Sequence, residues 1–226
     1  MAGLNLSTAL EALTAIALAL FVRQAPTLTP AQRAALEVGR TVVTTEQRPT
    51  AAWPAVTVFV FIDATPEQAA AIFTDVESHA TYIPSVTKSR ISRVIDSATM
   101  EVDYTLKVPV VSDEDYTVRD HISRTGDTYR VDWTLVRASS TRATVGHALF
   151  TPYTNTRTGR AGTLLEYHNF VTPGSRLAGM GFIRSRASAE VRETTESIVQ
   201  RVGMLRGTAA ATRRLAELRR ILGENR

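Results

Sequence analysis

Between residues 55 and 171, short runs of alternating apolar and polar residues recur, which is the pattern of strands with one buried face. The first run, at 55–62, carries apolar residues at both parities, so both of its faces are expected to be covered. Turn residues such as Gly126 and Asp127 separate the runs, which predicts antiparallel strands connected in sequence. The expected strands are 55–62, 86–95, 99–108, 116–124, 128–136, 144–152 and 163–171, with a further short one at 41–45.

Helical signals precede, interrupt and follow these runs. A threonine at the N-cap before a proline, as in Thr29-Pro30 and Thr65-Pro66, is a favourable helix start. Near the C-terminus, apolar residues recur every three or four positions, which predicts a long helix with one face against the sheet. The expected helices are 31–38, one that begins at Pro66 with an apolar stripe of Ala69, Ile72 and Phe73, 76–81, 175–205 and 209–222.

Four features of the chain resemble motifs of one protein superfamily. They are Val58–Ile62 followed by Asp63-Ala-Thr-Pro-Glu67, the pair Phe73-Thr-Asp75 and Tyr82-Ile-Pro84, the hairpin Val108-Pro-Val-Val-Ser-Asp-Glu-Asp-Tyr116, and the turn Thr172-Pro-Gly174. In this combination the chain resembles the START-like (SRPBCC) lipid-binding superfamily, which also contains polyketide cyclases and the birch-pollen allergen fold. The resemblance covers about Trp53 to Leu205, and it departs at Glu114, where the superfamily usually has an arginine.

The resemblance implies an α+β helix-grip fold. This is a curved antiparallel sheet of about seven strands wrapped around a long C-terminal helix, here with additional N-terminal and C-terminal helices. It also implies a cavity between sheet and helix that holds a lipid, sterol, isoprenoid or polyketide, although fold alone does not fix function. We divide the chain into a signal-like or amphipathic helix with a connector at 1–52, a START-like domain at 53–206, and a basic amphipathic tail helix at 207–226.

The N-terminal apolar run, at 12–22, has two interpretations. It is too short for a membrane span of about 20 residues, but it has the length of a signal-peptide core. Ala17-Leu-Ala19 resembles a cleavage site, whereas no lysine or arginine precedes the run. The alternative is a packed amphipathic helix with an apolar stripe of Leu6, Leu10, Leu13, Ala17 and Leu20. We favour an exported, periplasmic or membrane-tethered protein over a cytoplasmic one.

Charge is concentrated at the C-terminal end. The 226 residues have a net charge of +4, and residues 176–226 hold eleven arginines and five glutamates, a local net charge of +6. Peripheral contact with an anionic membrane surface is one interpretation, and a solvated or packed helix face is the other. Nucleic-acid binding is not expected, because no aromatic residues lie among the tail arginines. The absence of cysteine excludes disulfides, thiolate zinc sites and cysteine nucleophiles.

We expect a ligand to meet the first half of the long helix and the middle of the strands. Gly179 and Gly181 weaken the helix start by about 1 kcal/mol each relative to alanine, which suits a cavity entrance or, alternatively, close packing on a strand. Arg184 falls on the inward stripe, where it needs a carboxylate such as Glu166 or Asp132, a ligand headgroup, or a route to the surface. The ligand-binding candidates are Tyr104, Tyr116, Trp133, Phe150, Glu166, Leu177, Met180, Gly181, Arg184 and Ala187, each with core packing or a surface position as its alternative.

The sequence offers little for catalysis. His147 and His168 lie on consecutive expected strands and should approach each other, but no third residue with metal-site spacing accompanies them. The acidic residues 113–115 are expected to form a solvated hairpin tip. We therefore name no catalytic residue and expect neither a metal nor a cofactor.

The predicted function is binding and transfer of a hydrophobic small molecule by a protein that is not an enzyme. The alternative is a polyketide cyclase/aromatase-like or hydrolytic enzyme that acts in the same cavity. A third hypothesis is an interaction module whose groove is filled by its own side chains. The sequence sets no oligomeric state.

Overall fold

The computed structural model describes residues 28–49, 51–107, 113–174 and 181–224. For residues 181–184, 186 and 187 it describes the backbone alone. The segment that was assigned to a signal or packed helix, and residues 108–112 of the proline-containing hairpin, lie outside these residues.

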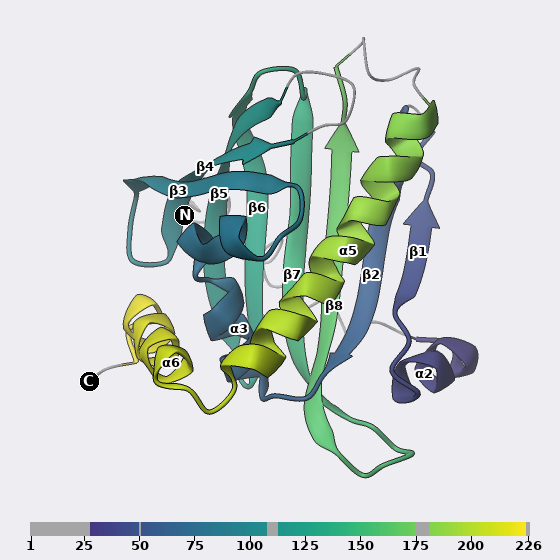
Figure 1. Ribbon diagram of the computed structural model, residues 1–226, viewed down its shortest axis with the longest axis vertical. Helices are drawn as coiled ribbons and strands as arrows, with labels where there is room; N and C mark the ends of the chain where they lie inside the picture. The colour runs from purple at the N-terminus through teal and green to yellow at the C-terminus, as the bar shows by residue number, and fades with distance from the viewer. Residues whose placement is uncertain (1–27, 50, 108–112, 175–180, 225–226) are drawn as a thin grey trace, which may run out of the picture.

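One antiparallel sheet dominates the fold (Figure 1). Its described strands follow the order β1-β2-β8-β7-β6-β5-β4-β3, so the pairing of β2 with β8 is the one step between strands distant in sequence. The expected short strand at 41–45 forms as β1 and raises the strand count to eight, one more than the expected seven. The strands are β1 Val42–Glu46, β2 Ala55–Ile62, β3 Val86–Val94, β4 Thr99–Leu106, β5 Glu114–Thr125, β6 Thr128–Ala138, β7 Ala143–Thr154 and β8 Ala161–Thr172.

Helices α2 and α3 begin within one residue of the positions that the sequence indicated. Thr29 and Thr65 each cap a helix through a reciprocal capping box, with Gln32 and Gln68 as the returning side chains. The expected short helix at 76–81 is a 3₁₀-helix, the form commonly taken by pieces of this length. The described helices are α2 Pro30–Glu37, α3 Pro66–Phe73, η1 Val76–Thr81, α5 Gly181–Leu205 and α6 Ala209–Ile221.

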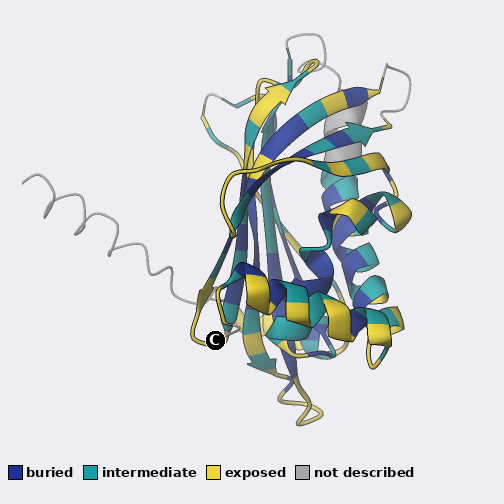
Figure 2. Cartoon of the chain, turned by 90° about the vertical axis from the view of Figure 1, so that its left-hand side faces the viewer, coloured by how far each residue is buried: buried dark blue, intermediate teal, exposed yellow. Residues whose placement is uncertain are grey.

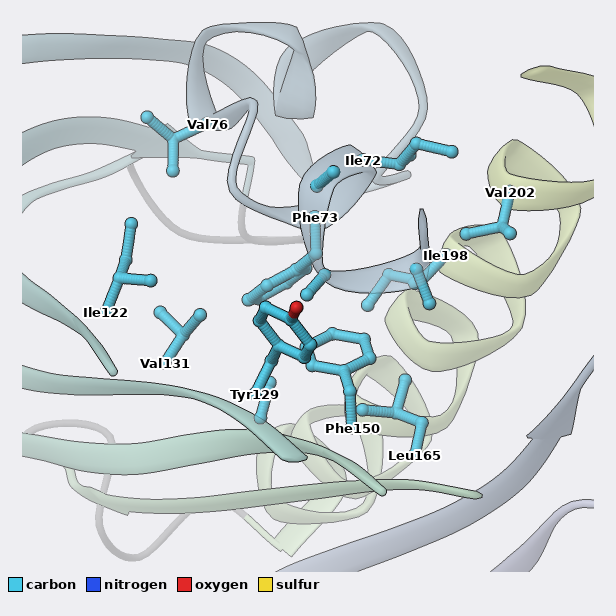
Figure 3. Packing of buried hydrophobic residues seen from close by; sticks show 14 of the residues in the cluster. Ile72, Phe73, Val76, Ile122, Tyr129, Val131, Phe150, Leu165, Ile198 and Val202 are labelled. Carbon is cyan, nitrogen blue, oxygen red and sulfur yellow. The ribbon is translucent and has the colours of Figure 1, made fainter. Parts of the chain in front are cut away.

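Helix α5 lies diagonally across one face of the sheet, which we call the inner face (Figure 1). Buried residues of α5 such as Ile198 and Val202 belong to the same core cluster as Val58 of β2 and Leu165 of β8. Figure 3 shows this packing, with Phe73 of α3 inserted between strands and helix. The other, outer face carries a smaller cluster around α2, which includes Leu36, Val42, Phe59 and Leu164.

Strand β2 is covered on both faces, as its apolar residues at both parities predicted. Val58 is fully buried in the inner cluster, and Phe59, the next residue, is 7% exposed in the outer one. The doubly apolar pattern thus comes from a strand placed between α5 and α2.

The basic tail helix α6 packs on the protein (Figure 2). Its apolar residues Leu218 and Ile221 are buried in the inner cluster beside α3. Arg219 donates two hydrogen bonds to the Glu67 carboxylate, at 2.7 and 2.9 Å, so part of its basic face is also engaged. Among the described helices, none is both long enough and apolar enough to cross a bilayer.

Candidate ligand-binding site

One register row crosses the inner face from the sheet edge to its middle. Each member is paired with the next across adjacent strands, so neighbouring side chains on this face lie roughly 5 Å apart. The row has a threonine at the sheet edge and a methionine at its other end, and most of the residues in between are polar or aromatic. From β1 to β4 it consists of Thr45, Val56, Asn169, Gly146, Trp133, Asp120 and Met100.

Trp133 is fixed in this row by a hydrogen bond and by aromatic contact. Its indole Nε1–H donates to Oδ1 of Asn169 at 3.3 Å, past the intervening Gly146. The ring of Tyr167 lies 5.0 Å from the indole, centroid to centroid. The polar edge of the tryptophan is therefore satisfied while its rings line the inner face.

Asp120 is a buried carboxyl group at the centre of the sheet, only 6% exposed. No hydrogen bond or ion pair reaches its carboxylate from the described residues. Burial raises its pKa to about 7, because removal from water disfavours the charged form. The group is consequently poised to change its charge near neutral pH.

Tyr104 belongs to a chain of hydrogen bonds that runs through His79 to the backbone of Phe73. The backbone carbonyl of Phe73 accepts a hydrogen bond from Nε2 of His79 at 2.8 Å, and Nδ1 of the same ring lies 2.9 Å from the Tyr104 hydroxyl. Burial lowers the pKa of His79 to about 4, so the ring is neutral at neutral pH and its Nδ1 accepts from Tyr104. The chain fixes Tyr104, whose ring stacks on that of Tyr116 at 5.3 Å.

The hydroxyl groups of Tyr116 and Tyr167 differ from that of Tyr104. Within the described part of the chain, neither has a hydrogen-bond partner. Burial raises the pKa of both, and the carboxylates of Asp120 and Glu190 raise it further. Both phenols are thus neutral, and each can donate one hydrogen bond and accept others.

Glu190 brings a second acid to this region from the opposite side. It lies on α5, and its carboxylate accepts a hydrogen bond from the hydroxyl of Ser85. The sheet contributes Asp120 and the helix contributes Glu190, so acidic groups face the tyrosines from both layers. We call Tyr104, Tyr116, Asp120, Trp133 and Tyr167 the acidic aromatic cluster.

Several solved structures share the fold of this protein. No protein-family model and no curated protein matches the sequence. Among solved structures, the STAR-related lipid transfer protein from Xanthomonas axonopodis superposes with a TM-score of 0.62 at 13% identity, over 72% of this chain and 93% of that one. Human StAR-related lipid transfer protein 5 gives 0.57 at 13% identity over 74% and 83%, and a START superfamily protein from Mycobacterium smegmatis gives 0.54 at 13% over 67% and 98%.

The protein has a START-like helix-grip fold. The order of strands, the sheet around α5 and the solved structures agree on this point. At these levels of identity the comparison establishes the fold, and the chemistry of the site has to come from the residues themselves.

Three of the sequence-predicted ligand residues come together in this START-like fold. Tyr104, Tyr116 and Trp133 all point to the inner face and belong to the acidic aromatic cluster. Leu177 and Met180 lie outside the described residues. Gly181, Arg184 and Ala187 lie in the first half of α5, where the backbone alone is described.

Phe150 lies elsewhere than the sequence analysis placed it. It is 0% exposed, and its ring lies 5.7 Å from that of Phe73 within the packed core (Figure 3). Its side chain thus leaves no surface for a ligand to contact, because its aromatic bulk fills the space between β7 and α3.

Glu166 also departs from the expected position. It alternates with Leu165 and Tyr167, which face inward, so its carboxylate points to the outer face. There His147 Nε2 lies 3.0 Å from the Glu166 carboxylate, and the rings of His147 and His168 stack at 5.2 Å. The predicted approach of the two histidines is confirmed, but the sheet stands between this group and the face that α5 covers.

Residues 113–115 are not simply a solvated turn. Glu114 is 8% exposed, and its carboxylate accepts hydrogen bonds from the backbone N–H groups of Ser140 and Thr141 and from the hydroxyls of Ser139 and Ser140. Burial opposes its ionisation, but these donors outweigh it and lower its pKa. Glu114 therefore ties the start of β5 to the turn between β6 and β7.

Asp120, Glu190, His79 and Tyr167 belong to the site but were not among the ligand-binding candidates chosen from the sequence. A signal for Asp120 was present, because it shares its parity in β5 with Tyr116, Val118 and Ile122. An acid on the buried parity of a strand is uncommon unless it has a function or a partner.

An open cleft of about 580 Å³ lies where the same row reaches the sheet edge. It is lined by Thr45, Gln47 and Pro54 from the β1–β2 region and by Ser185 and Ser188 from α5. Its lining is polar, unlike the cluster at the middle of the sheet. No group of three or more histidine, aspartate or glutamate side chains in the described ranges is arranged to hold a metal ion.

Proposed function

We propose that this protein binds a hydrophobic small molecule, such as a lipid, sterol, isoprenoid or polyketide, between the inner face and α5, and carries it. One observation is the main support: the carboxylate of buried Asp120 and the hydroxyls of the half-buried Tyr116 and Tyr167 have no hydrogen-bond partners among the described residues. Buried polar groups in proteins are almost always paired, so such a set calls for a ligand or bound water. Apolar strand residues around them supply the rest of the surface.

The energetic scale is adequate for binding. An apolar ligand that loses about 300 Å² of accessible surface gains roughly 7 kcal/mol, before the cost of association. Two of the similar structures are lipid transfer proteins, which agrees with the proposal without deciding it.

Recovery of a bound ligand tests this function. We expect native mass spectrometry of the purified protein to show an adduct near one molecule per chain, and lipid extraction to identify it. Returning that molecule to the delipidated protein should shift the NMR signals of inner-face residues such as Asp120 and Tyr167, while outer-face His121 and Asp132 serve as internal controls. Bulk membrane lipid at far below one molecule per chain, or equal shifts on both faces, would count against binding in the interior.

Catalysis in the same place is a second candidate, and the raised pKa of Asp120 favours it. A carboxyl group with a pKa of about 7 is suited to general acid–base chemistry near neutral pH. In that case the recovered molecule should change on incubation with the protein, and Asp120→Asn should retain binding and lose turnover. A ligand that leaves unchanged supports the carrier.

A further inference from the structure

We propose that Asp120, Tyr116 and Tyr167 form an acidic anchor for the polar end of the ligand, and that this end is a hydrogen-bond donor, an amine or a hydroxyl, and not an anion. The inference rests on the proposed function and specifies the chemical class of the ligand.

The first argument is the sign of the charge around the site. Among the described residues, the charged side chains that act on Tyr104, Tyr116 and Tyr167 are acids, namely Asp120, Glu190 and Glu114. No arginine or lysine among the described residues offsets them there. A ligand carboxylate or phosphate placed beside these groups would meet like charge in a medium that screens it poorly.

The second argument is hydrogen-bonding capacity. An ionised carboxylate only accepts hydrogen bonds, and Asp120 has no donor among the described residues. An ammonium group has three donors and a hydroxyl has one, so either can donate a hydrogen bond to this carboxylate. The Tyr116 and Tyr167 hydroxyls can then accept further donors or donate to the oxygen of an alcohol.

The third argument is position. Asp120 lies in the middle of the sheet, buried beside Trp133 and paired with Met100, so a polar end that reaches it leaves the remainder of the ligand among apolar and aromatic side chains. Because Asp120 is buried, a ligand head group that donates a hydrogen bond to it is strongly favoured. A head group that leaves the carboxylate unpaired is strongly disfavoured, since an unpaired buried charge is costly. The anchor would thus set both the orientation and the selectivity of binding.

Three probes with one alkyl chain separate the possibilities. We would titrate delipidated protein with decylamine, 1-decanol and decanoate, each below its micellar concentration and at about pH 8, where the amine is cationic and decanoate is ionised. The expected result is that the amine and the alcohol each bind at least about tenfold more tightly than decanoate, measured by calorimetry. The ratio of amine to alcohol affinity then tells which of the two head groups the anchor prefers.

Variants assign the preference to Asp120. In Asp120→Leu the advantage of the amine over decanoate should fall by about tenfold or more. Asp120→Asn, which preserves shape and hydrogen bonding, should lose the preference for the amine and keep binding of the alcohol. Asp132→Asn changes an acid that precedes Trp133 in β6, points to the outer face and is engaged by Arg130, and it should leave all three affinities unchanged.

The outcomes distinguish this inference from the function on which it rests. Equal affinity for the three probes, tighter binding of decanoate, or an unchanged preference in both Asp120 variants would overturn the acidic anchor and leave binding itself intact. Failure of every probe to bind, together with no ligand recovered from purified protein, would overturn the proposed function and the anchor with it.

Discussion

The indole of Trp133 lies against the α-carbon of Gly146, its register partner across β6 and β7. A methyl group on Gly146 would stand 2.5 Å from Cε2 and Cζ2 of the indole and would collide with the backbone oxygen of His168. The missing side chain is what lets the ring cross β7 and donate to Asn169 on β8. Gly146 is thus required by close approach and not by an unusual backbone angle.

Gly146→Ala should therefore destabilise the protein. Backbone of β8 cannot move aside cheaply, so we expect a loss of about 1–3 kcal/mol in the free energy of unfolding, measured by urea denaturation. Gly203→Ala is the matched control, because nothing lies within 4 Å of the added carbon and the residue is in the interior of α5. It should stabilise by roughly 0.5–1 kcal/mol. Equal effects of the two substitutions would contradict the close approach.

Two stacked tyrosines should respond differently to loss of their hydroxyls. Tyr104→Phe removes the donor to Nδ1 of buried His79 and should lower the free energy of unfolding by about 1–3 kcal/mol. Tyr116→Phe removes a hydroxyl with no partner among the described residues and should change it by less than about 0.5 kcal/mol in the ligand-free protein. Thermal or urea unfolding of both variants decides the matter, and a larger loss in Tyr116→Phe would place an unrecognised partner at that hydroxyl.

The sequence predicted the fold well because alternation and capping are local signals. Thr65-Pro66 started α3 at the expected residue, and the strands of the sheet were recovered to within a few positions. The prediction placed Glu166 on the wrong face of the sheet, and the cause of this error is equally local. Leu164 and Leu165 are both apolar and both buried, one in each core cluster, so the parity of β8 was ambiguous from the sequence.

The site was harder to predict because it depends on register. That Trp133 meets Gly146 and Asn169 follows from the pairing of three strands, and no periodicity within one strand fixes such pairing. Glu114 likewise receives its donors from a turn 25 to 27 residues away. Asp120 was also missed, although its parity in β5, shared with inward-facing Val118 and Ile122, was a local signal for an inward acid.

Glu114 should be important for stability although it lies in an acidic turn. Glu114→Ala removes an acceptor of hydrogen bonds from Ser139, Ser140 and Thr141, and we expect a loss of about 1.5–3 kcal/mol in urea unfolding. Asp113→Ala alters an exposed neighbour and should fall within about 0.5 kcal/mol of the wild type. The lowered pKa of Glu114 means that its contribution is present above the unfolded pKa and is lost as the pH falls. Similar losses in both variants would contradict the role of Glu114 as a clamp.

The buried carboxyl group of Asp120 predicts a contribution to stability that falls as the pH rises, the opposite of the dependence expected for Glu114. Its pKa is raised to about 7 in the folded protein, so the folded state holds a proton that the unfolded state has already released. Stability from this group is complete below about pH 4 and is lost as the pH rises through 7, by at most roughly 4 kcal/mol. Ligand-free Asp120→Asn does not titrate there and should escape this loss.

Urea unfolding of wild type and Asp120→Asn across this range measures the effect as a difference, in which other groups such as His79 cancel. Wild type should weaken relative to the variant as the pH rises. Asp103→Asn supplies the opposite case, because a hydrogen bond from Thr117 lowers the pKa of Asp103 and its contribution should disappear as the pH falls. A wild-type minus Asp120→Asn difference that is independent of pH would mean that Asp120 ionises in the folded protein as readily as in water. The carboxylate would then already have a partner, and a ligand head group would not be needed to supply one.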